Sequence, residues 1–180
     1  MLRHLFRSLR KPQQEAARRL FETAVAQARQ PTFYSLGGVP DTVDGRFEMV
    51  SLHVFFLLHR LKGEAQDGGA TAQALIDLMF ANLDQSLREL GAGDLGVAPR
   101  IKRMASGFYG RVAAYDAGLK GSLTVLEAAL GRNLFGTAQP SAPQLSLMAD
   151  YVSRAAVGLK GQATALLLAG DVHFETAPLY

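Results

Sequence analysis

The sequence predicts an all-α fold, a single-domain helical bundle of about seven to eight helices. Apolar residues recur every three or four positions along most of the 180-residue chain, and the alternation typical of strands is nearly absent. Glycine and proline gather between these periodic segments, where helices are expected to end. Hydrophobic residues make up 48% of the chain and charged residues 19%, which is enough to build a core and excludes general disorder.

The first predicted helix, residues 2–11, is amphipathic, and Pro12 is expected to end it. Its apolar residues fall within an arc of roughly 100°, and its basic residues lie on the opposite side. We treat residues 1–12 as a basic N-terminal helix that lies either on the protein's own core or on a lipid surface, and residues 13–180 as one all-α domain. The residues expected at such a membrane surface are Leu2, Arg3, Leu5, Phe6, Arg7, Leu9, Arg10 and Lys11.

A second helix is predicted over residues 13–27, and an irregular segment follows over residues 31–45. Irregular segments of this length are often functional. Asp41 or Asp44 is expected to cap the helix that comes next, because a carboxylate accepts hydrogen bonds from the unpaired amides of a first turn. Gly45 is expected to allow close backbone packing at the same place.

The third predicted helix, residues 46–62, is apolar on nearly every side, which is typical of the central helix of a bundle. His53 lies within it and is expected to be a hydrogen-bonded core residue rather than a catalytic one. Further helices are separated by segments rich in glycine and proline, and a loose C-terminal tail closes the chain. These helices are predicted over residues 71–90, 99–117, 123–134, 144–159 and 163–169.

Residues that carry enzyme chemistry are scarce. The chain has no cysteine, which excludes disulfides, thiol nucleophiles and cysteine-rich zinc sites. Its four histidines include no pair at the i, i+4 spacing of a helical metal site, and no glycine-rich phosphate loop or nucleophile elbow is present. We therefore expect no metal, no cofactor and no catalytic residue. The most apolar stretch, residues 49–58, has about half the length of a membrane span.

The formal net charge of +3 is unevenly distributed. Before Pro40 the chain has seven basic and two acidic residues, or +5, and the rest has 12 basic and 14 acidic residues, or −2. A basic head on a near-neutral body suggests an anionic partner, which is a membrane surface, an acidic protein or RNA. Arg100, Arg103 and Arg111 also share one flank of the predicted 99–117 helix.

Three blocks of sequence are similar to the ubiquinol–cytochrome c reductase (complex III) chaperone family. The first block, residues 41–53, is DTVDGRF, then five intervening residues, then His53. The second, residues 87–97, is LREL followed directly by GAGDLGV, and the third, residues 101–115, is IKRMASGFYGRVAAY. The three blocks occur in the order and at the spacing found in the family. The resemblance as a whole covers about residues 33–134. The chain resembles the compact alphaproteobacterial type of member.

The resemblance implies an all-helical, non-enzymatic assembly chaperone for the cytochrome bc complex, which escorts newly made cytochrome b and needs no cofactor. It also implies a cytoplasmic protein, peripheral on the inner face of the inner membrane, with a possible ribosome contact and no DNA partner. The sequence leaves two alternatives open. One is an RNA- or ribosome-associated binding module, and the other is a small all-α enzyme that acts on an apolar substrate.

The motif positions of the family suggest one groove. A helical hairpin would bring the joint between the fourth and fifth predicted helices beside the aromatic face 108–115. Tyr109 and Tyr115 are expected to be aromatic contacts of this groove. Arg88 and Arg111 are expected to form its charged rim.

The complete set of motif residues falls into two groups. Candidate client or partner contacts are Arg46, Arg88, Glu89, Asp94, Tyr109, Arg111 and Tyr115. Candidate structural residues are Asp41, Asp44, Gly45, His53, Gly91 and Gly110.

Overall fold

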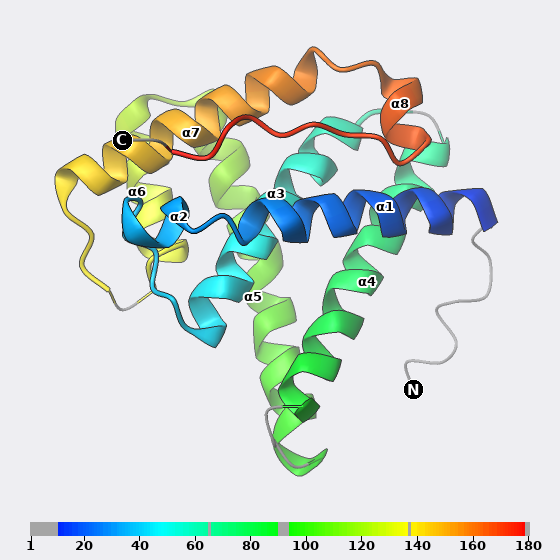
Figure 1. The fold of residues 1–180 in the computed structure, drawn as a ribbon, viewed down its shortest axis with the longest axis horizontal. Coiled ribbons are helices and arrows are strands. Elements are labelled where there is room, and N and C mark those ends of the chain that lie inside the picture. The colour runs from blue at the N-terminus through cyan, green and yellow to red at the C-terminus, as the bar shows by residue number, and fades with distance from the viewer. Residues whose placement is uncertain (1–10, 65, 90–93, 137, 179–180) are drawn as a thin grey trace.

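The computed structural model describes residues 11–64, 66–89, 94–136 and 138–178, and these residues form eight helices and no strand (Figure 1). The predicted all-α bundle is therefore confirmed. The helices are α1 (Lys11–Ala28), α2 (Thr32–Ser35), α3 (Val43–Leu61), α4 (Gln66–Glu89), α5 (Asp94–Lys120), α6 (Leu123–Asn133), α7 (Ala142–Lys160) and α8 (Thr164–Leu168).

Helix α3 lies at the centre of the bundle, as its apolar sequence predicts. It packs against α1, α4, α5 and α7. Leu52 and Phe56 lie on one side of the helix and Val54 and Leu57 on the other, and all four are buried. Gly63 follows the helix with a φ of +87°, the left-handed conformation that favours glycine just beyond a helix end.

Helix α1 begins at Lys11, so Pro12 lies in its first turn. The expectation that Pro12 ends a preceding helix is wrong, because a proline in a first turn only removes an N–H that has no partner within the helix. Residues 1–10, the rest of the predicted basic N-terminal helix, lie outside the described residues. Helix α1 packs against α4 and α3 and fully buries Ala17 and Ala24.

The N-terminal cap of α3 differs from the prediction. The helix starts at Val43, and the Thr42 side-chain oxygen accepts a hydrogen bond of 3.1 Å from the backbone N–H of Gly45. The expectation that Asp41 or Asp44 caps this helix is therefore wrong. The entry point lies a turn earlier in the sequence than the apolar periodicity indicates, which makes threonine the residue at the cap position.

The two aspartates form ion pairs instead. Asp41 Oδ1 accepts a hydrogen bond of 2.6 Å from Arg46 Nε, and Asp44 Oδ1 accepts one of 2.6 Å from Arg100. Asp44 lies in the first turn of α3, where a negative charge is also favoured by the helix dipole.

Gly45 packs tightly against the loop that precedes α3. A Cβ atom at this position would lie 1.9 Å from the Pro40 carbonyl oxygen, far inside van der Waals contact. The expectation of close backbone packing at Gly45 is confirmed.

Helices α4 and α5 form an antiparallel hairpin that projects from the rest of the bundle (Figure 1). Both are longer than predicted, because α4 begins at Gln66 and α5 begins at Asp94. Pro99 lies inside α5 and does not start it. At about 1.5 Å per residue, each helix of the hairpin is about 36–40 Å long.

The C-terminal tail is not loose. It runs extended between α1 and α7 (Figure 1, red), and Val172 and Ala177 are buried. The Gln162 side chain hydrogen-bonds both backbone groups of His173, donating to its carbonyl at 2.6 Å and accepting from its N–H at 3.0 Å. The Gln27 side chain donates to the Glu175 carbonyl at 2.8 Å. The side-chain amides of Gln27 and Gln162 therefore satisfy backbone groups of the tail that a neighbouring strand would pair in a sheet.

His53 is a buried, hydrogen-bonded core residue, as predicted. Its Nδ1 lies 2.8 Å from the Met49 carbonyl, which can only accept, so Nδ1 carries the proton. Its Nε2 then accepts from the Tyr151 hydroxyl at 2.7 Å. Phe174 of the tail packs edge-on against the imidazole. Burial lowers the pKa of His53 to about 4, so the ring is neutral near pH 7.

Candidate functional site

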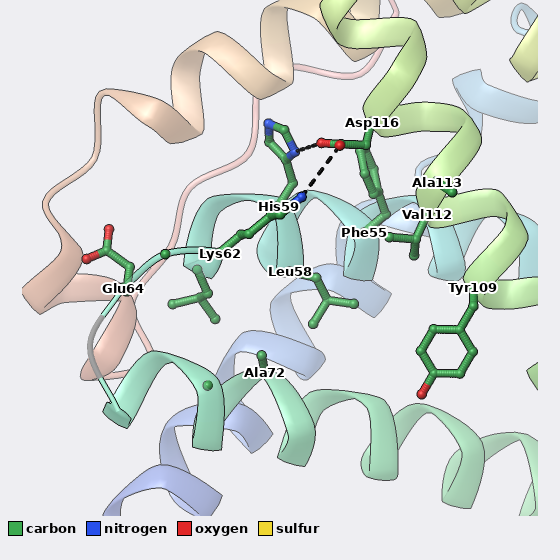
Figure 2. Close-up of a pocket in the computed structure, with 13 residues that line it drawn as sticks. Phe55, Leu58, His59, Lys62, Glu64, Ala72, Tyr109, Val112, Ala113 and Asp116 are labelled. Carbon is green, nitrogen blue, oxygen red and sulfur yellow. Dashed lines mark ion pairs between the residues drawn. The ribbon is translucent and has the colours of Figure 1, made fainter.

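A hollow of about 510 Å³ lies where α3 ends, α4 begins and α5 passes (Figure 2). Its walls are mainly apolar and include Phe55, Leu58 and Val112. Tyr109 stands at the rim with 58% of its surface exposed, which is unusual for so large an aromatic residue. This arrangement can take up an apolar side chain or one face of an apolar helix.

An ionic cluster borders the hollow. Asp116 Oδ1 lies 2.9 Å from His59 Nδ1, and Asp116 Oδ2 lies 3.6 Å from Lys62 Nζ and 2.6 Å from Lys120 Nζ (Figure 2 draws the first two pairs). The hydrogen bond from Lys120 and the positive charges nearby hold the pKa of Asp116 below its usual range. The Asp116 carboxylate is therefore ionised at neutral pH, and it joins α5 to the end of α3.

A second hollow, of about 600 Å³, lies beside the first and shares His59, Lys62 and Glu64 with it. Leu119 and Val157 line it, and Val157 is 72% exposed. We call the two hollows together the α3–α5 groove. The first hollow is mainly apolar, whereas the second is mixed, because Arg60 and Lys160 line it together with Leu119 and Val157.

In the described part of the chain, no group of three or more histidine, aspartate and glutamate side chains is placed to hold a metal ion. None of the described helices is both long and apolar enough to cross a membrane.

Tyr115 does not line this groove. It is fully buried, with its ring 5.4 Å from that of Phe55. Its expected role as an aromatic contact at an open surface is wrong, because residue 115 points from α5 into the core. Burial raises the pKa of its hydroxyl well above the usual range.

Arg111 lies on the other side of α5, turned about 200° from Tyr109 at 100° per residue. There it forms an ion pair with Glu48 of α3, and both side chains are largely buried. The Arg111 guanidinium packs over Gly107, where a Cβ would lie 2.3 Å from one of its terminal nitrogens. Burial raises the pKa of Glu48 to about 7, and the hydrogen bond and charge of Arg111 oppose this shift.

The basic flank of α5 is mostly paired within the protein. Arg111 pairs with Glu48, and Arg100 pairs with Asp44. These arginines line a hollow of about 580 Å³ together with Arg103. Two of the three cations on the flank thus have an acidic partner on α3, which weakens the case for RNA binding there.

The remaining predicted contacts lie near the tip of the hairpin. The Arg88 side chain donates to Asp84 at 2.7 Å, and Glu89 accepts from Gln85 at 2.8 Å. Asp94 is the first residue of α5. Gly91 lies outside the described residues.

The tip and the α3–α5 groove are separate places. Tyr109 follows Asp94 by fifteen residues, which is about 22 Å along a helix. The expectation that Arg88, Tyr109 and Arg111 border one groove is therefore wrong. The hairpin is long, and its two ends present different surfaces.

Two motif residues lie apart from these surfaces. Arg46 is exposed at the start of α3, paired with Asp41. Gly110 lies in α5 beside open space, and a Cβ there would meet no atom within 4 Å.

Sequence reasoning missed the ionic cluster. Tyr109, Val112, Ala113 and Asp116 share one face of α5 at spacings of three and four residues, and that pattern could have placed Asp116 beside Tyr109. No local pattern indicates that His59, more than fifty residues earlier, lies opposite.

Comparison with known proteins gives a consistent result. A family model described as "Ubiquinol-cytochrome C chaperone" matches residues 36–174. Ubiquinol-cytochrome-c reductase complex assembly factor 1 of Xenopus laevis is 27% identical over 158 residues, covering 87% of this chain and 79% of the relative. The mouse protein of that name is 28% identical over 161 residues, covering 89% of this chain and 55% of the relative, so the chain spans about half of its length.

A solved structure is also similar. The crystal structure of the Cbp3 homolog from Brucella abortus is 42% identical to this chain, with a TM-score of 0.83 and coverage of 98% of both chains.

Proposed function

Because this chain belongs to the ubiquinol–cytochrome c chaperone family, we propose that it acts as a non-enzymatic assembly chaperone of ubiquinol–cytochrome c reductase. The family match over residues 36–174 carries the proposal. We propose newly made cytochrome b as the client, held at the inner face of the inner membrane by a peripheral, cytoplasmic protein.

The α3–α5 groove supports this role and is the proposed client site. A chaperone of a membrane protein has to cover apolar surface for a time. The groove offers two exposed apolar residues, Tyr109 beside the mainly apolar first hollow and Val157 beside the mixed second one. An apolar helix segment of the client would place its side chains in these hollows.

The experiment compares cells that lack the protein with cells that carry variants of it. Loss of the protein should abolish most assembled cytochrome bc complex, measured on native gels. Tyr109→Ala should lower complex levels and weaken client capture about 30-fold, because exposed aromatic residues at interfaces often contribute about 2 kcal/mol. Leu166→Ala, at another exposed apolar residue, on α8 and outside the groove, is the matched control.

Normal complex levels in cells without the protein would contradict the assembly role, provided that no second family member is present. Equal effects of Tyr109→Ala and Leu166→Ala would contradict the groove as client site and leave the assembly role standing. Circular dichroism of each purified variant separates a lost contact from a lost fold.

The basic head is proposed to attach the protein to membranes. Residues 1–11 carry four basic residues, and each basic residue near an anionic surface contributes about 1 kcal/mol. Deletion of residues 1–12 should therefore leave the fold intact and reduce sedimentation with anionic vesicles, but not with neutral ones. Equal sedimentation of both forms with anionic vesicles would contradict this prediction.

A further inference from the structure

A third hollow, of about 350 Å³, lies away from the α3–α5 groove and shares no lining residue with it. It is enclosed by the end of α1, by α2, by the start of α3 and by the second half of α4. Buried Phe47, Met79 and Leu83 form its floor, and Val43 and Val50 line its sides. Its size is at the lower end of small-ligand pockets, which suits one flexible chain better than a folded segment.

Two arginines stand at the mouth of this hollow. Arg46 binds Asp41 through Nε alone, so both of its terminal nitrogens lack a partner among the described residues. The structure describes no ion pair of Arg29. Arg29, Arg46 and Tyr34 line the same hollow. Burial raises the pKa of the Tyr34 hydroxyl; the charges of Arg46 and Arg29 lower this pKa, and the charge of Asp41 raises it.

The rest of the rim is polar but less charged. Asn82 and Ser86 of α4 follow one edge, and Glu89 lies at its far end, where it accepts a hydrogen bond of 2.8 Å from Gln85. The hollow has no histidine or cysteine in its lining. It is therefore a binding pocket with an apolar interior and a cationic edge, without a catalytic group.

We propose that this pocket binds one acyl chain of an anionic membrane phospholipid, with the phosphate held by Arg29 and Arg46. Arginine pairs recognise phosphate through several charge-assisted hydrogen bonds, and the chain below the head would cover the apolar floor. The inference is independent of the proposed chaperone role, because it uses neither the groove nor the client.

The test uses the full-length protein with methyl-labelled methionine and dodecyl phosphate below its critical micelle concentration. The Met79 methyl resonance should shift on titration, because Met79 lies in the pocket floor, and the Met148 resonance should not. Dodecyl maltoside and dodecyltrimethylammonium have the same chain with a neutral and a cationic head. They should bind at least tenfold more weakly than dodecyl phosphate.

Variants separate the chain from the head. Arg29→Gln should weaken binding of dodecyl phosphate about tenfold and leave that of dodecyl maltoside unchanged, and Arg29→Lys should restore part of the loss. Arg132→Gln, at an exposed arginine of α6, is the matched control. Val50→Phe should fill the pocket and abolish binding of all three probes. If Val50→Phe does not fold, Ser86→Phe is the second variant, because a phenylalanine at this rim position of α4 should also fill the pocket and abolish binding.

Three results would overturn the proposal. They are an unshifted Met79 resonance, equal affinity of Arg29→Gln and the unchanged protein for dodecyl phosphate, and stronger binding of an acidic peptide than of the amphiphile.

Discussion

Glu48→Gln is expected to convert a nearly pH-independent stability into one that rises steeply with pH. Two buried groups titrate in opposite directions in this protein. Glu48 takes up a proton on folding and His53 gives one up, because burial disfavours the charged form of each. In the unchanged protein the two effects should nearly cancel between about pH 4.5 and pH 6.5.

The direction of each effect follows from the pKa values. The pKa of Glu48 is raised from 4.5 to about 7, so its contribution is fully present below pH 4.5 and is lost as the pH rises through 7. The pKa of His53 is lowered from 6.5 to about 4, so its contribution is present above pH 6.5 and is lost as the pH falls through 4. Each shift corresponds to about 3 kcal/mol of unfolding free energy.

The measurement is urea unfolding of both proteins at several pH values across this window. In Glu48→Gln only the His53 effect remains, and the free energy of unfolding should rise by about 2 kcal/mol from pH 4.5 to pH 6.5. The carboxylates of Glu64 and Asp116 have lowered pKa values, so their effects fall mainly below this window.

Glu127→Gln, on the surface of α6, is the matched control and should follow the unchanged protein. A flat profile for Glu48→Gln would mean that His53 does not titrate as its burial requires. A steep rise in the unchanged protein would mean that Glu48 stays ionised, with its charge fully balanced by Arg111.

Gly45→Ala is expected to lower the free energy of unfolding by about 3 kcal/mol or more. The added Cβ would lie 1.9 Å from the Pro40 carbonyl oxygen and 3.0 Å from its carbonyl carbon. Both are backbone atoms, so no side chain can rotate away. The loop before α3 would have to move, which would also disturb the Thr42 cap.

Gly110→Ala provides a control from the same set of motif residues. A Cβ there would meet nothing within 4 Å, and Gly110 lies in the interior of α5. Alanine should therefore raise the free energy of unfolding, by about 0.5–1 kcal/mol, because it is the better helix former. Thermal and urea unfolding should show that Gly45→Ala lowers the free energy of unfolding and that Gly110→Ala raises it. Similar stabilities of the two variants would contradict the close approach at Gly45.

Local physics made much of the fold predictable from the sequence. The apolar periodicity of α3 follows from 3.6 residues per turn, and a helix apolar on all sides has to lie inside a bundle. His53 was placed correctly by the same reasoning, since an imidazole among apolar residues needs hydrogen-bond partners. Gly63 follows the end of α3 in the left-handed conformation that favours glycine, which is the local signal for a helix end.

Proline and capping residues were harder to interpret. Pro12 is compatible with either the end or the beginning of a helix, and it lies in the first turn of α1. Pro99 lies in the interior of α5, although a proline there favours a helix start. Thr42 and Asp44 are both good caps in isolation, and the close contact of Gly45 with Pro40 fixes where the helix starts.

The sequence by itself determined the fold class, the central helix and the family resemblance, because these depend on neighbours along the chain. The tertiary structure alone decided which motif residues share a surface. Tyr109, Arg111 and Tyr115 lie within two turns of α5, yet one is exposed, one pairs with Glu48 and one is buried. A helix turns 100° per residue, so the elements packed around it, not its sequence, decide what each side chain meets.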